Sequence, residues 1–151
     1  MGFLSRLKEN AMDLQANLVT QAKQFKNQKF ADATMAACAL VAAADGNIDA
    51  NERRKTASFI SSNEILSSFD VSKLQKTFTE YCDKLNADFD FGKIDLLQVI
   101  SKLKKNEAQA RAAVQVAVII GYADGTFDDD EKKVVGEICR SLGIDKAEFD
   151  L

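Results

Sequence analysis

Hydrophobic residues recur every three or four positions along most of the chain, and this spacing predicts an all-α protein. The sequence has no proline, so nothing of that kind interrupts the helical pattern. Short helices or turns are expected at 63–69 and 145–151, and a break in the pattern at 88–92. We expect seven helices, at about residues 3–26, 30–44, 50–61, 70–86, 94–103, 107–122 and 129–142.

Two of the expected helices, residues 30–44 and 107–122, are almost uniformly apolar and rich in small side chains. Such segments are typical of central helices with close neighbours on every side. The 151 residues fit one domain. We expect an amphipathic N-terminal helix over 1–28, a first half over 29–88 and a second half over 89–151. The halves are expected to pack with pseudo-two-fold symmetry.

One acidic segment occurs twice, 79 positions apart. Residues 44–52 and 123–131 share the pattern Ala-Asp-Gly-x-apolar-Asp-x-x-Glu, and each lies between two expected helices. We call them the first and the second acidic corner. A duplicated helix–turn–helix unit is the simplest origin of this repeat.

One interpretation of the corners is purely structural. Each has a glycine suited to the left-handed conformation that ends a helix, and an Asp–Glu pair spaced as in a reciprocal N-terminal cap. The glycines and the pairs are Gly46 with Asp49 and Glu52, and Gly125 with Asp128 and Glu131.

The second interpretation is a divalent-cation site, because Asp45 and Asp124 fall at helix C-termini, where the dipole disfavours an anion by about 0.3–1 kcal/mol. The spacing also matches the second half of a calcium-binding loop. The first half would fall on apolar residues such as Val41 and Ile120, which excludes an ordinary EF-hand. A partial calcium or magnesium site is left, with the more acidic second corner favoured. Its candidate ligands are Asp45, Asp49, Glu52, Asp124, Asp128 and Glu131.

The composition excludes much enzyme chemistry. The chain has no histidine, so Ser–His and Cys–His nucleophiles and His-ligated metals are impossible. Cys38, Cys82 and Cys139 are widely spaced within apolar patterns and are interpreted as buried free thiols. We therefore expect a non-enzymatic cytoplasmic protein. A thiol-based reductase is an alternative, and it would need an exposed cysteine of low pKa. A hydrolase that uses carboxylates alone is a more distant alternative.

The charge distribution limits the partners. A net charge of −3 argues against a nucleic-acid binder. Residues 1–29 hold five basic side chains against two acidic ones. The N-terminal helix is expected to pack on the body, with peripheral contact to an anionic membrane or a partner as the alternative. No apolar run is long enough to span a membrane.

At these residues the chain resembles the TerB family of tellurite-resistance proteins, whose fold also occurs in the N-terminal helical region of some membrane-linked DnaJ-type co-chaperones. The most specific segment is Asp124 to Lys132. Other shared motifs are the segment 26–30, Phe89-Asp90, the segment 140–143 and Ala147-Glu148-Phe149.

The resemblance implies a compact helical domain that serves a bacterial tellurium-resistance or stress-response system. It further implies an integral membrane-protein partner on the cytoplasmic side and a divalent-cation site at the shared carboxylates. The expected role is that of an accessory or scaffold protein. An interaction module without a metal, in which the corners are only helix caps, is the alternative.

Overall fold

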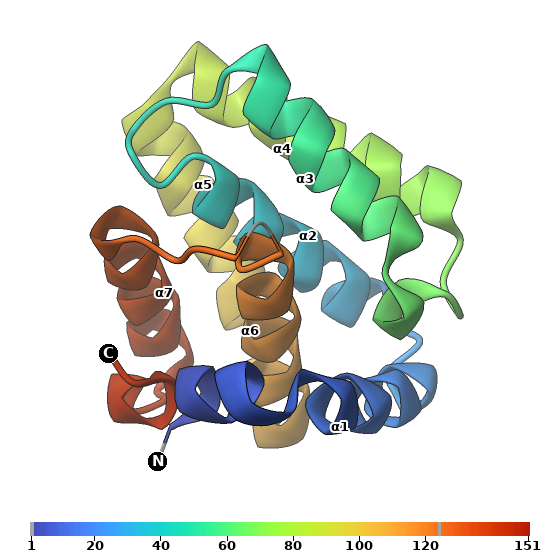
Figure 1. The fold of residues 1–151 in the computed structure, drawn as a ribbon. Coiled ribbons are helices and arrows are strands. Elements are labelled where there is room, and N and C mark those ends of the chain that lie inside the picture. The colour runs from blue at the N-terminus through green and yellow to red at the C-terminus, as the bar shows by residue number, and fades with distance from the viewer. Residues whose placement is uncertain (1, 124) are drawn as a thin grey trace.

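The described part of the chain, residues 2–123 and 125–151, contains helices and no strands in this computed structural model, so the all-α prediction is confirmed (Figure 1). Short 3-10 helices are labelled η. The elements in chain order are α1 (Phe3–Gln24), α2 (Gln28–Ala42), α3 (Ala50–Ser62), η1 (Glu64–Leu66), α4 (Val71–Ala87), α5 (Phe89–Ser101), α6 (Glu107–Gly121), α7 (Asp129–Leu142) and η2 (Lys146–Phe149).

The repeat extends to the boundaries of the helices. Asn27 caps α2 by accepting a hydrogen bond from the Phe30 amide at 2.8 Å, and Asn106 caps α6 through the Gln109 amide at 3.1 Å. These two asparagines are 79 positions apart. The same offset relates the first residues of α2 and α6, the last residues of these two helices, and the first residues of α3 and α7. Equivalent caps therefore start equivalent helices. The pseudo-two-fold packing of the halves stays a prediction.

The core forms around α2 and α6, which pack against each other, while α2 also contacts α4 and α5. Every residue of α2 from Ala33 to Val41 is buried. Small side chains allow this, because they let neighbouring backbones approach α2 from several sides. Both acidic corners follow directly from this central pair, so the core fixes where the corners lie.

The N-terminal helix α1 packs on the body, where it contacts α6, η1 and η2 (Figure 1). Its non-helical residue Asn10 (φ −149°) divides it into two stretches, a break that the sequence pattern did not predict. An amphipathic helix binds a membrane through its apolar face, and that face is buried here. Its buried residues are Phe3, Leu4, Leu7, Leu18 and Ala22.

The expected break at 88–92 is confined to Asp88, which lies between α4 and α5 in an extended conformation. Asp88 accepts a hydrogen bond from the Phe91 amide at 3.1 Å and starts α5, so the residues after it are helical. Gly92 is buried in this helix rather than ending one. A Cβ atom at Gly92 would lie 2.9 Å from the Lys84 carbonyl oxygen and 3.1 Å from the Leu85 Cα. The glycine therefore permits close packing of α5 on α4.

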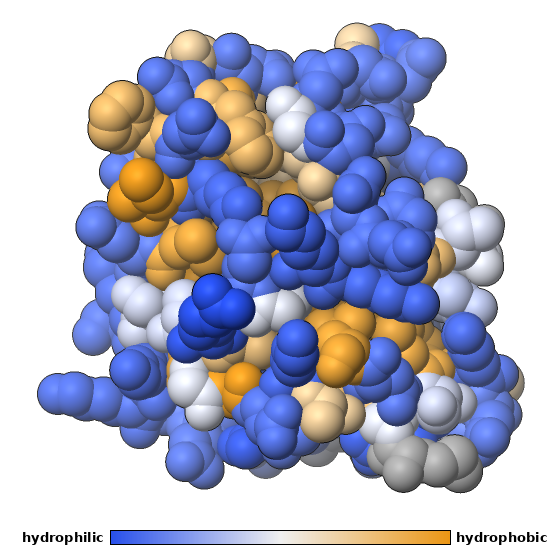
Figure 2. Space-filling view, turned by 90° about the vertical axis from the view of Figure 1, so that its left-hand side faces the viewer, coloured by the Kyte–Doolittle hydropathy of each residue, from blue (hydrophilic) through white to orange (hydrophobic). Residues whose placement is uncertain are grey.

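The surface is mainly polar. On the face shown in Figure 2, hydrophilic residues predominate and hydrophobic residues reach the surface in separate groups. Among residues 2–123 and 125–151, the large hydrophobic side chains that are exposed are Met12, Phe91 and Ile94. Within the described residues, no helix combines the length and the apolar character needed to cross a membrane.

Candidate functional site

Each acidic corner begins with a sharp turn at a glycine. Gly46 has φ +91° and Gly125 has φ +90°, a left-handed conformation that residues with a Cβ rarely adopt. The Gly46 amide donates to the Ala43 carbonyl at 2.9 Å, and the Gly125 amide donates to the Tyr122 carbonyl at 2.8 Å. The two corners therefore turn in the same way, as their shared sequence predicts.

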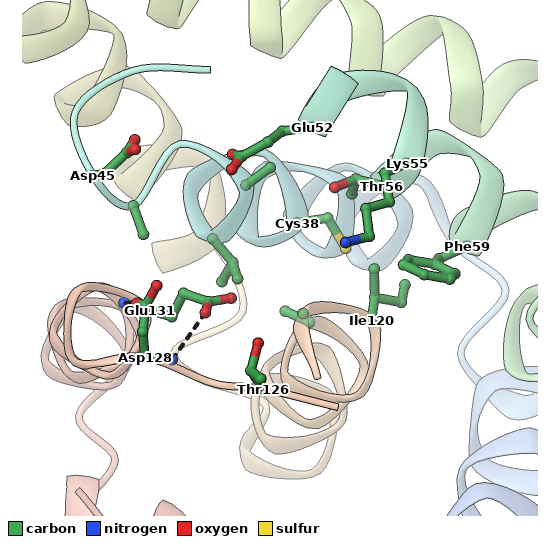
Figure 3. Close-up of a pocket in the computed structure, with 15 residues that line it drawn as sticks. Cys38, Asp45, Glu52, Lys55, Thr56, Phe59, Ile120, Thr126, Asp128 and Glu131 are labelled. Carbon is green, nitrogen blue, oxygen red and sulfur yellow. Dashed lines mark hydrogen bonds between the residues drawn. The ribbon is translucent and has the colours of Figure 1, made fainter. Parts of the chain in front are cut away.

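The predicted N-terminal caps are confirmed in both corners, and the predicted reciprocal bond from the glutamate is found in the second corner. Asp49 Oδ1 accepts from the Glu52 amide, and Asp128 Oδ1 accepts from the Glu131 amide, both at 2.8 Å. In the second corner, Glu131 Oε1 also accepts from the Asp128 amide at 2.9 Å, which completes a capping box. The carboxylate of Glu52 is directed into the space between the corners (Figure 3). The glutamate therefore takes part in the cap in the second corner, whereas in the first corner it faces the space between the corners.

The first-corner aspartate, Asp45, is compensated locally. Its Oδ1 accepts from the Asn47 amide at 3.1 Å, which offsets its unfavourable place after the end of α2. A cation is therefore not needed to explain Asp45. Its counterpart Asp124 lies outside the described residues.

Carboxylates from both corners line one pocket of about 160 Å³. Asp45 and Glu52 come from the first corner, and Asp128 and Glu131 from the second (Figure 3). Asp49 caps α3 beside it. The pocket is also lined by apolar and thiol side chains of the central helices and α3, including Cys38, Val41, Phe59 and Ile120. The fold thus joins two segments that are 79 residues apart in sequence.

The electrostatics of Glu52 show that the corners influence each other. Its pKa is raised, first by partial burial and then by the negative charges of Asp45 and Asp49. The Lys55 ammonium works in the opposite direction, and Asp128 adds a smaller upward effect. Because Asp128 belongs to the second corner, like charges repel across the pocket as well as within one corner.

The donor set fits a hard divalent cation, since calcium and magnesium prefer carboxylate and other oxygen ligands. However, among residues 2–123 and 125–151 no three Asp, Glu or Cys side chains are grouped closely enough to hold a metal ion as they stand. The described residues therefore supply suitable donor atoms without a finished coordination sphere. Asp45, Glu52, Asp128 and Glu131 are the predicted ligands that the pocket brings together.

Sequence reasoning missed Lys55. It lines the pocket together with the four carboxylates and lies one helical turn after Glu52. Residues three apart on a helix share a face, so this spacing could have revealed a basic side chain beside the acidic ones.

The thiols do not form a reactive site. Cys38, Cys82 and Cys139 are free and buried, as predicted. Burial is the main cause that raises the pKa of each thiol to about 12. A reductase nucleophile needs the opposite, an accessible thiolate.

Comparison with known proteins identifies the family of this chain. The family model described as "Tellurite resistance protein TerB" matches residues 31–151, a region that contains both acidic corners. The chain belongs to the TerB family. This TerB-family chain is 28% identical over 118 residues to the "Tellurium resistance protein TerB" of Alcaligenes sp., which covers 78% of the chain and 97% of that relative. No solved structure matches it. Helix α1 precedes the matched TerB region.

Proposed function

We propose that this TerB-family chain is a non-enzymatic accessory protein of a bacterial tellurite-resistance and stress-response system. It binds calcium or magnesium between its acidic corners and engages an integral membrane protein. Family membership supports the biological setting. The observation that carries the cation proposal is the convergence of carboxylates from both corners on one pocket.

The proposed ligands are Asp45, Asp49 and Glu52 with their counterparts Asp124, Asp128 and Glu131. A bound cation supplies positive charge that offsets repulsion among these carboxylates. Glu52 lies in the first turn of α3 and Glu131 in the first turn of α7. Ligands from both would couple the starts of these helices and fix the surface around the pocket. The partner protein would recognise that surface.

The proposed role in resistance is indirect. Tellurite is an oxyanion, and an acidic pocket repels anions. The buried thiols offer no reducing group at the surface. The chain would therefore act through its partner instead of binding or reducing the toxic anion.

The first test is a calcium and magnesium titration monitored by amide NMR shifts, with wild type and the double variant Asp45→Asn/Asp124→Asn. We expect saturable shifts around residues 44–52 and 123–131, and their loss in the double variant. Linear, diffuse shifts that the substitutions leave unchanged would refute the cation site.

An interaction module without a metal is the second candidate. The described carboxylates accept the hydrogen bonds of caps and turns, and no group of three among them is arranged for a metal. Stability that does not respond to calcium or magnesium would favour this function.

The membrane-protein partner can be tested in bacteria that carry a complete tellurite-resistance system. Asp130 is exposed and lies in sequence between the pocket residues Asp128 and Glu131. A photo-crosslinking residue at this position should capture an integral membrane protein, while the same residue at Lys76 on α4 should not. Equal capture at both positions, or capture of soluble proteins alone, would contradict the proposed surface.

A further inference from the structure

The acidic pocket contains a cation of its own, the ammonium group of Lys55. This lysine lines the pocket with Asp45, Glu52, Asp128 and Glu131. Figure 3 shows its side chain extending from α3 into the pocket. The positive charge of Lys55 is opposite in sign to the four carboxylates that line the pocket with it.

The repeat shows that Lys55 is not part of the duplicated scaffold. At an offset of 79 residues, Glu52 corresponds to Glu131, but Lys55 corresponds to Val134. Val134 is 5% exposed and packs in the core. Both corners therefore contribute carboxylates to the pocket. At this position of the repeat, only the first half has a lysine.

We propose that Lys55 is a tethered competitor of the divalent cation, which balances the pocket carboxylates in the absence of an ion and thereby sets the affinity for one. The inference rests on the proposed function, because it concerns the same pocket. A lysine suits this role, since its compact charge sits on a flexible four-carbon stem. Lys55 is also exposed to solvent as a residue.

The competition predicts a specific change in affinity. Removing one positive charge near a doubly charged ion in a solvent-open pocket should tighten binding about three- to tenfold after screening. Lys55→Met removes the charge while keeping a long apolar stem. Lys55→Arg keeps the charge, and Lys76→Met on α4 makes the same change in net charge away from the pocket.

The experiment is calorimetric titration of the full chain with calcium and with magnesium, for wild type and these three variants. We expect Lys55→Met to bind about three- to tenfold more tightly than wild type. Lys55→Arg and Lys76→Met should stay close to wild type. Thermal unfolding in chelator and in calcium gives a second reading, in which Lys55→Met should gain more stability from calcium than wild type does.

The outcomes separate this inference from the proposed function. If wild type binds and Lys55→Met binds no more tightly, or if Lys76→Met tightens equally, Lys55 is not a competitor although the cation site stands. If Lys55→Met binds and wild type does not, the competitor is supported and the native cation site is lost. If no variant binds either ion, both proposals fall.

Discussion

At the scale of single residues, the acidic corners combine two properties that the sequence pattern alone could not separate. Asp128 caps α7 and also lines the pocket. A cap needs an oxygen acceptor, whereas a cation site needs negative charge. Substitutions that keep one property and remove the other therefore distinguish the two roles.

Asp128→Ala in chelator should lower the free energy of unfolding by about 1 kcal/mol, because the Glu131 amide loses its capping partner. Asp128→Asn should cost much less, since asparagine is an equally good cap. Urea denaturation measures both. An equal loss in the two variants would show that charge, and not the hydrogen bond, stabilises this helix start.

The three cysteines should be almost inert toward a thiol reagent at pH 8 in the native protein, because burial raises their pKa to about 12. Modification should proceed at the rate of unfolding, whereas an exposed control cysteine in Lys76→Cys should react at once. Since the thiol pKa is higher in the folded state than the ordinary 9.0, the stability linked to it should be lost as pH rises from 9 toward 12. Fast modification of a cysteine in the native protein at pH 8 would support the reductase alternative.

At the scale of helices, local sequence determines where most elements begin. Side chains such as Asn27, Asp70 and Asn106 cap their helices. Helix starts marked in this way were predictable within a few residues. The start of α5 was not predictable. Gly92 looks like a helix breaker in the sequence, but in the fold it lies inside α5 and permits close contact with α4. Only the approach of α4 reveals that role.

Two glycines inside helices provide a matched test of this distinction. Alanine is favoured over glycine in a helix by about 1 kcal/mol. A Cβ at Gly136 would meet only the Lys146 Cδ at 3.9 Å, so Gly136→Ala should stabilise the protein by about 0.5–1 kcal/mol. Gly92→Ala should destabilise it by about 1–3 kcal/mol, because α5 must move away from α4. Thermal unfolding measures the stability of both variants. Stabilisation by both substitutions would show that the contact between α4 and α5 can accommodate a methyl group.

At the scale of the whole molecule, long-range contacts build features that no local pattern contains. The repeat identified the candidate carboxylates, but it could not show that the corners share a pocket or that Lys55 joins them. The packing of α2 against α6 determines the shared pocket, since it brings together two segments that are 79 residues apart in sequence. The helical fold was predictable from periodicity, whereas the site depended on this packing.

The two ends of the described chain are also joined by packing. Asp150 accepts hydrogen bonds from the Gly2 amide at 2.9 Å and the Ser5 amide at 2.7 Å, so it caps α1 from the other end of the sequence. The hydrogen bonds from Ser5 and then Gly2 hold the pKa of Asp150 below its ordinary value. Phe3 lies against Phe149 beside this contact, with ring centroids 5.6 Å apart.

Asp150→Ala should loosen α1 and leave the central helices in place, because it removes both acceptor bonds at the start of α1. Hydrogen exchange should become at least severalfold faster in residues 3–9 and stay unchanged in α6. Asp150→Asn keeps an acceptor and the left-handed backbone that asparagine tolerates (φ +62° here), so its effect should be smaller. The stabilisation should be present above the ordinary carboxyl pKa and be lost as pH falls through the lower folded value. Equal exchange in all three proteins would show that Asp150 does not hold α1.

This contact has a consequence for synthesis of the chain in the cell. Ser5 and Asp150 are 145 positions apart, so at ordinary translation rates roughly 10–30 s pass between the appearance of the first and the second. During that interval, Phe3 has neither Phe149 nor the Asp150 cap to hold its helix in place. The nascent protein therefore presents an amphipathic helix to its surroundings before the fold can close over it. A ribosome-bound chaperone would meet α1 as an exposed segment that the finished molecule conceals.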